Sequence, residues 1–144
     1  MATIKLKNYK QIIDEIPEVN DFTNVYFYVN RYNIDQKYIK YLDELSGLKD
    51  EIISNWLNIT TRTYRNYKTK DVSLKDNTKE HIVLLLSLYK HGIEVFETKE
   101  EFEKWLIAPN VLLDKKAPMI FLDTVSGLKF IDNRLTAMEY GENV

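Results

Sequence analysis

The stretch from residue 77 to residue 96 most limits what this chain can fold into, because its apolar residues occupy nearly every face of a predicted helix. A helical spacing links Ile82, Leu85, Leu86, Tyr89, Ile93 and Phe96. Val83, Leu84 and Leu88 widen that stripe. A helix that is apolar nearly all round is buried. We therefore expect a long central helix, capped at Asn77–Thr78, with the segments on both sides packed against it.

Composition bounds the class of protein. The 144 residues are 44% apolar and 29% charged, which is ordinary for a soluble chain of one large or two small domains. Without cysteine the chain has neither a disulfide framework nor a thiolate metal site, and this suits a reducing compartment. Residues 1–10 lack the apolar core of a signal peptide, and the apolar run Ile82–Leu88 is too short to span a membrane. We expect a cytoplasmic protein with no membrane partner and no cofactor.

Residues 48–70 have the pattern of two short helices joined by a tight turn. The first is predicted over about Lys49–Leu57 and the second over Thr61–Lys70. Asn58 tolerates a left-handed conformation, Thr60 is a good N-cap, and small Ser54 leaves room for the helices to cross. This is a helix-turn-helix layout.

The second of these helices is strongly basic. It reads TRTYRNYKTK, with four cations and no acid. Arginine can pair with guanine and asparagine with adenine, while threonine and lysine hold phosphates. The candidate DNA-binding residues are Thr60, Thr61, Arg62, Thr63, Arg65, Asn66 and Lys68. A solvated basic helix face is the alternative interpretation.

Charge is unevenly distributed along the chain. Residues 48–93 carry eight basic and five acidic side chains, whereas residues 94–144 carry six basic and ten acidic ones. The asymmetry suggests that the two regions bind different partners.

Residues 22–32 are rich in β-branched and aromatic side chains, so propensity allows either a strand or a helix. We favour a helix, because Phe22, Val25, Tyr26 and Val29 fall on one helical face. Asp35 and Gly47 are expected to begin and end the next helix. The tyrosines of this region are either a core edge or a homodimer interface, in which tyrosine is enriched, and the candidates are Tyr26, Tyr28 and Tyr32.

The C-terminal third is predicted to contain three short helical segments. Thr98 with Glu101 is a capping-box pattern that opens the first, and Pro109–Asn110 closes it. Pro118 is placed to open the second, which carries Met119, Leu122 and Val125. The third carries the stripe Leu128, Ile131, Leu135 and Met138. Gly127 and Gly141 are expected to be left-handed residues that end the second and third segments.

The order of these residues resembles the C-terminal domain of Xre–MbcA–ParS-type antitoxins, the partners of RES-domain toxins. The residues that carry the resemblance are Phe96, Trp105–Leu106, Pro109–Asn110, Leu113, Pro118, Leu122, Thr124, Gly127, Leu135 and Tyr140–Gly141. The segment from Ile59 to Arg65 also resembles the family's helix-turn-helix. The family often places two glycines where this chain has Asp114–Lys115, so the shape of the loop before Pro118 is left open. The alternative is that these residues are caps and core of an ordinary helical domain.

The resemblance implies an all-α antitoxin of a type II toxin–antitoxin pair. Residues 1–96 would form an Xre-like helical region with a dimerising N-terminal part and a helix-turn-helix at about 48–70. The long buried helix would join it to a toxin-binding domain at residues 97–144. The implied function is to cover the active-site cleft of a RES-domain toxin that consumes NAD, and to repress the chain's own operon by binding operator DNA.

The candidate toxin-binding residues lie around the first short segment and at the end of the chain. They are Trp105, Pro109, Asn110, Arg134, Glu139, Tyr140, Gly141, Glu142 and Val144. A cleft that binds NAD must hold a pyrophosphate and is expected to be basic. We therefore expect the acidic end, with Glu139 and Glu142, to occupy it as a phosphate mimic. A frayed, solvated terminus is the alternative.

Two other functions are alternatives to the antitoxin role. One is a DNA-binding transcription regulator whose C-terminal domain senses a ligand or dimerises and has no toxin partner. The other is a small enzyme, which the sequence supports poorly. His81 and His91 are ten residues apart, which is not a metal-ligand spacing on a helix, so we expect both on the helix surface.

Overall fold

The computed structural model describes residues 10–16, 19 and 22–141. Within these residues every regular element is an α-helix or a 3-10 helix, apart from an isolated β-bridge between Asn110 and Lys116. The predicted all-α fold class is confirmed. The chain forms two compact units, residues 1–87 and 88–144, and the division falls inside one long helix. The domain boundary predicted near Glu97 stays a prediction.

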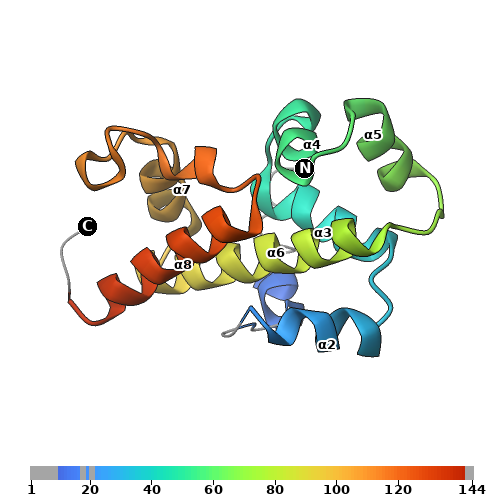
Figure 1. Ribbon diagram of the computed structural model, residues 1–144, viewed down its shortest axis with the longest axis horizontal. Coiled ribbons are helices and arrows are strands. Elements are labelled where there is room, and N and C mark those ends of the chain that lie inside the picture. Colours follow the sequence, from blue (N-terminus) through green and yellow to red (C-terminus); the bar gives the residue numbers. More distant parts are fainter. Residues whose placement is uncertain (1–9, 17–18, 20–21, 142–144) are drawn as a thin grey trace. The chain divides into compact units, whose positions relative to one another are not determined.

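The first unit is built from short helices. After a helical segment at residues 10–15 come α2 (Asn24–Arg31), α3 (Gln36–Ser46), α4 (Asp50–Leu57) and α5 (Thr61–Thr69) (Figure 1). Residues 24–31 are helical, so of the two conformations allowed by propensity the helix is the correct one. The buried side chains Ile39, Leu42, Leu45, Ile53, Trp56, Leu57 and Tyr64 form much of this unit's core.

Polar caps and left-handed residues set the ends of these helices. The Asp35 carboxylate accepts a hydrogen bond from the Lys37 backbone N–H at 3.0 Å and opens α3, and Gly47 ends it with φ of 62°. Asn58 ends α4 with φ of 59°. Thr60 Oγ1 accepts a hydrogen bond from the Thr63 N–H at 3.1 Å and opens α5. All four positions agree with the sequence predictions.

The long helix α6 (Asp76–Phe96) runs from the first unit into the second (Figure 1). Ile82, Val83, Leu84, Leu85, Leu86, Leu88, Tyr89 and Ile93 are all buried, so the predicted burial nearly all round is confirmed. The helix begins slightly earlier than predicted: the Lys79 N–H bonds to the Lys75 carbonyl at 2.9 Å, which places Thr78 inside the first turn. It ends at Phe96, and the left-handed Glu97, with φ of 72°, follows it.

The second unit continues with α7 (Lys99–Ile107), the 3-10 helices η1 (Val111–Leu113) and η2 (Pro118–Phe121), and α8 (Val125–Glu139). Thr98 Oγ1 accepts a hydrogen bond from the Glu101 N–H at 3.1 Å, so the predicted cap of α7 is confirmed. Pro118 opens η2 as predicted. The core of this unit is made by Phe102, Leu106, Leu113, Leu122, Leu128, Ile131 and Leu135.

The prediction for Gly127 was wrong. The second segment is only a short 3-10 helix, and Gly127 lies in the first turn of α8, where its N–H donates to Thr124 Oγ1 at 3.0 Å. A Cβ on Gly127 would lie 1.9 Å from the Phe121 carbonyl oxygen. Glycine is therefore needed here for the close approach of η2 and α8. Gly141 does adopt the left-handed conformation predicted for it, with φ of 81°.

Candidate functional site

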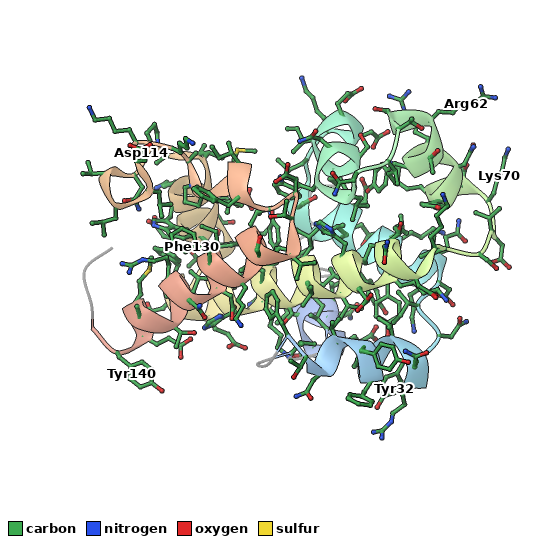
Figure 2. The ribbon with its side chains drawn as sticks, viewed as in Figure 1. Tyr32, Arg62, Lys70, Asp114, Phe130 and Tyr140 are labelled. Carbon is green, nitrogen blue, oxygen red and sulfur yellow. The ribbon has the colours of Figure 1, made fainter. Side chains whose placement is uncertain are left out.

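The predicted DNA-binding residues lie in the first unit, on α5 and the turn before it. Ser54 of α4 is buried, and its Oγ lies 3.2 Å from Thr61 Oγ1, so the two helices cross closely where the small side chain allows it. Arg62 is exposed and points away from the helix, and Lys70 at the other end does the same (Figure 2). Thr63 and Asn66 are partly exposed. These side chains leave a polar face of α5 open to solvent.

Two predicted DNA-binding cations, Arg65 and Lys68, are paired with acids of neighbouring helices. Arg65 Nε lies 2.9 Å from Asp50 Oδ2, and Arg65 Nη2 lies 3.3 Å from Glu51 Oε1. Lys68 Nζ lies 2.6 Å from Asp50 Oδ1 and 3.4 Å from Asp43 Oδ1. The four cations counted in the sequence of α5 are therefore not equally available to a ligand. Sequence reasoning missed these pairs because their acids stand on α3 and α4.

A hollow lies at the start of α5. It is lined by Asn58, Ile59, Thr60, Thr63, Tyr67 and Lys75. Hydroxyl, amide and ammonium groups meet here beside the first turn of a helix, a combination suited to an anion such as a phosphate.

Helix α2 exposes most of its aromatic side chains. Tyr26 is 60% exposed, Phe27 66% and Tyr32 48%, whereas Tyr28 is half-buried with its hydroxyl 3.2 Å from that of Tyr38. Tyr32 stands at the outer surface of this helix (Figure 2). Phe27, which the sequence did not single out, is the most exposed of the set. Val25 is buried, so this single residue anchors α2 most deeply.

In the second unit, Trp105 belongs to an aromatic cluster. Its ring centroid lies 5.5 Å from that of Phe96 and 6.3 Å from that of Phe102. The Trp105 Nε1–H is buried and has no hydrogen-bond partner among the described residues. The ring of Phe102 also packs where a Cβ on Gly92 would lie, which draws α6 and α7 together. Trp105 thus contributes more to the packing of the second unit than to a binding surface.

The loop after α7 carries the next two predicted residues. Pro109 is exposed, and the Asn110 side chain opens η1 by accepting a hydrogen bond from the Leu112 N–H at 2.9 Å. Val111 is 83% exposed and Leu112 is 54% exposed, although both are apolar. The sequence prediction did not include Val111 and Leu112 among the binding residues. The sequence nevertheless indicates their exposure, because the three consecutive apolar residues 111–113 of a short loop cannot all face one core.

An open groove lies between η2 and the first turns of α8. Its lining consists of Ile120, Phe121, Asp123, Thr124, Ser126, Gly127 and Phe130. The Phe121 and Phe130 rings are 5.5 Å apart, and Phe130 faces outward (Figure 2). Ile120, at 54% exposed, and Phe130, at 42%, add to the accessible apolar surface of this unit.

The end of α8 is tied to α6 through His91. His91 Nδ1 lies 2.6 Å from Asp132 Oδ1, and His91 Nε2 bonds to Glu139 Oε1. Burial alone would lower the pKa of His91, but the hydrogen bonds to the two carboxylates outweigh it and raise that pKa to about 9. At neutral pH His91 is therefore charged, and Asp132 and Glu139 share its single positive charge.

These contacts correct two predictions about histidine. His91 was expected on the helix surface, but it is largely buried and doubly bonded, and His81 is 6% exposed. Among the other predicted toxin-binding residues, Arg134 is half-buried and Tyr140 is 82% exposed (Figure 2). Glu142 and Val144 lie outside the described residues.

Two further observations concern membrane spans and metal ions. In the part of the chain that the structure describes, none of the helices combines the length and the apolar character needed to cross a bilayer. Within the same residues, no three histidine, cysteine or acidic side chains gather in a way that could hold a metal ion.

Comparison with known families finds a match within the second unit. Residues 91–141, about a third of the chain, match the family model described as the antitoxin Xre/MbcA/ParS C-terminal toxin-binding domain. No curated protein gives a significant match. The matched segment contains α7, η1, η2 and α8, and hence the groove, the exposed loop and the His91 cluster. The resemblance stated for the C-terminal residues is confirmed.

Proposed function

We propose that this chain is an antitoxin that neutralises a toxin protein through residues 91–141. The match of that segment to an antitoxin toxin-binding domain carries the proposal. The chemistry of the second unit agrees with a binding role, because it presents apolar groups and a groove to solvent. We expect the chain itself to be no enzyme and to need no cofactor.

The partner we propose is a RES-domain toxin that consumes NAD. This follows from the type of antitoxin that the C-terminal residues resemble. The antitoxin would act sterically, by covering the cleft in which the toxin binds the dinucleotide. Acidic side chains outnumber basic ones ten to six in residues 94–144, and this favours a basic cleft as their counterpart.

We propose that two surfaces of the second unit contribute to toxin binding. One is the exposed apolar set of Val111, Leu112, Ile120 and Phe130. Apolar contacts of this kind form the centre of protein interfaces, whereas acids act at the rim. The other is the end of the chain from Tyr140 onward, where Glu142 is the acid to test. Glu139 is a weaker candidate for a phosphate mimic than the sequence suggested, because His91 already pairs with it.

We also propose that α4 and α5 form a helix-turn-helix that binds operator DNA and represses the chain's own operon. The support is the left-handed Asn58 between two helices in close contact, and the exposed Arg62 at the start of the second. Replacing Arg62 and Arg65 together by alanine should weaken promoter binding by about 1–3 kcal/mol for each specific contact that is lost. Most of the loss should come from Arg62, because Arg65 is already paired with Asp50 and Glu51. Unchanged affinity in this double variant would remove the support for α5 as the reading helix.

Co-expression with a RES-domain protein, sought first among the products of the neighbouring genes, tests the antitoxin role. The full chain should restore growth, co-purify with the toxin and stop its consumption of NAD. A chain with Val111→Ser and Leu112→Ser should inhibit less, whereas Glu100→Gln, an exposed acid of α7 in the same unit, should inhibit normally. If the full chain does not restore growth, does not co-purify with the toxin and does not lower its consumption of NAD, the antitoxin proposal is wrong. A transcription regulator without a toxin partner would then be the better interpretation.

Deletion of residues 141–144 tests the acidic end separately. These residues follow α8, so their removal should leave the core of the unit intact. Weaker inhibition of NAD consumption by the shortened chain would assign the plug to this end. Equal inhibition would leave the apolar surface as the part that covers the cleft.

A further inference from the structure

The carboxylate of Asp50 joins two cations of α5 through its two oxygen atoms. Oδ1 lies 2.6 Å from Lys68 Nζ, and Oδ2 lies 2.9 Å from Arg65 Nε. Asp50 is the first residue of α4, whereas Arg65 and Lys68 are on consecutive turns of α5. A single carboxylate thus draws two positive charges back onto the preceding helix.

The arrangement is partly shielded from water. The side chains of Asp50 and Lys68 are only 19% and 23% exposed. The hydrogen bond from Lys68 lowers the pKa of Asp50 although burial opposes it, so the carboxylate is charged at neutral pH. Burial acts against the charge of Lys68, but the hydrogen bond to Asp50 and the nearby carboxylates raise its pKa overall. Both groups remain ionised, and the pair is less screened than a fully exposed one.

The charge near these cations is negative overall. Asp43, Asp50 and Glu51 supply three carboxylates against the two cations Arg65 and Lys68. Asp50 and Glu51 also occupy the first turn of α4. In a helix-turn-helix the first helix crosses the DNA backbone, so in the proposed complex carboxylates on α4 would repel nearby phosphates.

Arg62 stands apart from this cluster. It is exposed on the first turn of α5, and its side chain extends away from the helix (Figure 2). The ion pairs found among the described residues do not include Arg62. Arg62 can therefore reach a nucleic acid without giving up a contact, whereas Arg65 and Lys68 must exchange a carboxylate for a phosphate. That exchange makes little net gain, because one ionic hydrogen bond replaces another.

We propose that Asp50 restrains DNA binding. Its carboxylate holds Arg65 and Lys68 against α4, so that Arg62 makes the first contact with DNA. The affinity for DNA is then lower than it would be if all the cations of α5 were free. This inference rests on the proposed DNA binding by α5. It assigns Asp50 the part of a positioning residue whose negative charge weakens the complex.

Asp50→Asn tests the inference, because the amide keeps the size of the side chain and removes its charge. Binding to two duplexes should be measured over a range of salt concentrations, one from the promoter of the chain's own operon and one of mixed sequence. Asp50→Asn should tighten binding to both duplexes roughly three- to thirty-fold at low salt, and steepen the slope of log affinity against log salt by about 1–2. The steeper slope reports cations newly engaged with phosphates, and a merely structural effect would not produce it.

Matched variants separate the possible causes. Glu100→Gln removes the same charge from the second unit and should leave DNA affinity unchanged. Arg65→Gln added to Asp50→Asn should cancel part of the gain, because one of the released cations is then missing. Circular dichroism should show that each variant keeps its helices.

The outcomes are distinct. If the unaltered chain binds DNA and Asp50→Asn binds equally tightly, Asp50 does not restrain binding. If Asp50→Asn binds less tightly, Asp50 instead orders α5 for binding. If neither chain binds either duplex, the proposed operator binding is wrong, and the inference is overturned with it.

Discussion

Asp114 and Lys115 adopt the left-handed conformation, with φ of 58° and 63°, although neither is glycine. Outside glycine this conformation costs roughly 1–2 kcal/mol for each residue. The loop before Pro118 therefore keeps at both positions the backbone conformation that a pair of glycines would adopt readily. Asp114 and Lys115, which stand where the family often has two glycines, thus still adopt a conformation that suits glycine. Asp114 stands at the outer edge of this loop (Figure 2).

Lys115→Gly should relieve this strain and raise the free energy of unfolding by about 1 kcal/mol, less the extra entropy of glycine in the unfolded chain. Denaturant-induced unfolding measures the change. Lys116→Gly is the control, because Lys116 lies outside the left-handed region and its carbonyl accepts a hydrogen bond from the Asn110 N–H at 3.1 Å. That variant should lower stability, and a loss of stability in both variants would contradict the strain at Lys115.

A second prediction at this scale concerns His91. Its pKa of about 9 in the folded protein lies above the ordinary value of 6.5, so its pairing with Asp132 and Glu139 stabilises the fold fully below pH 6.5. That contribution is lost as the pH rises from 6.5 through 9. Unfolding experiments at pH 6 and pH 10 should show a larger loss of stability for the unaltered chain than for His91→Gln. A charged hydrogen-bonded group of this kind contributes on the order of 2 kcal/mol.

Lys104→Gln provides the control for His91, because Lys104 forms an exposed pair with Glu101 at 3.1 Å and should matter little. Titration of the His91 imidazole followed by nuclear magnetic resonance gives its pKa directly. A value at or below 6.5 would show that the two carboxylates do not hold the ring as described.

At the scale of elements, the approach of η2 to α8 depends on Gly127. A methyl group there would meet backbone, the Phe121 carbonyl oxygen, which cannot rotate away as a side chain can. Gly127→Ala should therefore destabilise the second unit by about 1–3 kcal/mol and disturb the groove lined by Ile120 and Phe130. Ser126→Ala, one residue earlier and exposed, should change stability by less than about 0.5 kcal/mol. Thermal unfolding of both variants, together with their inhibition of the toxin, tests the point; equal stability would show that η2 can move.

At the scale of the whole molecule, the exposed aromatic face of α2 predicts a homodimer. Tyr26 and Phe27 of α2 are exposed, together with Tyr32 directly after the helix, and contact with a protein partner accounts for this apolar surface better than contact with solvent. A second copy of the chain would also suit paired half-sites on DNA. Light scattering at concentrations on the order of tens of micromolar should report a dimer. Dimerisation in this range corresponds to a weak to moderate affinity. Tyr26→Ser with Phe27→Ser should give a monomer that keeps its helices.

Tyr28→Phe is the matched control for the dimer prediction, since it removes only the hydroxyl that lies beside Tyr38. It should leave the oligomeric state unchanged. A strict monomer from the unaltered chain would contradict the predicted homodimer.

The features that sequence alone determined are local ones. Asp35, Thr60 and Thr98 cap helices because each side chain bonds to a backbone N–H two or three residues away, and Asn58 and Gly141 turn the chain through their own dihedral angles. The buried α6 and the all-α class follow from a repeat that is visible over a few turns. The ordered pattern from Phe96 to Gly141 is likewise visible in the sequence, and residues 91–141 match the antitoxin toxin-binding family model that it resembles.

Tertiary structure decided which charged and apolar groups are available. Arg65 and Lys68 looked like free cations until the fold brought Asp50 to them from the start of α4, and Glu139 looked like a free acid until His91 met it from α6. Gly127 and the exposed Val111 were equally ambiguous, because helical spacing does not tell which neighbour approaches. An ion pair or a close contact depends on distances between residues far apart in the chain, and only the packing of helices sets those distances.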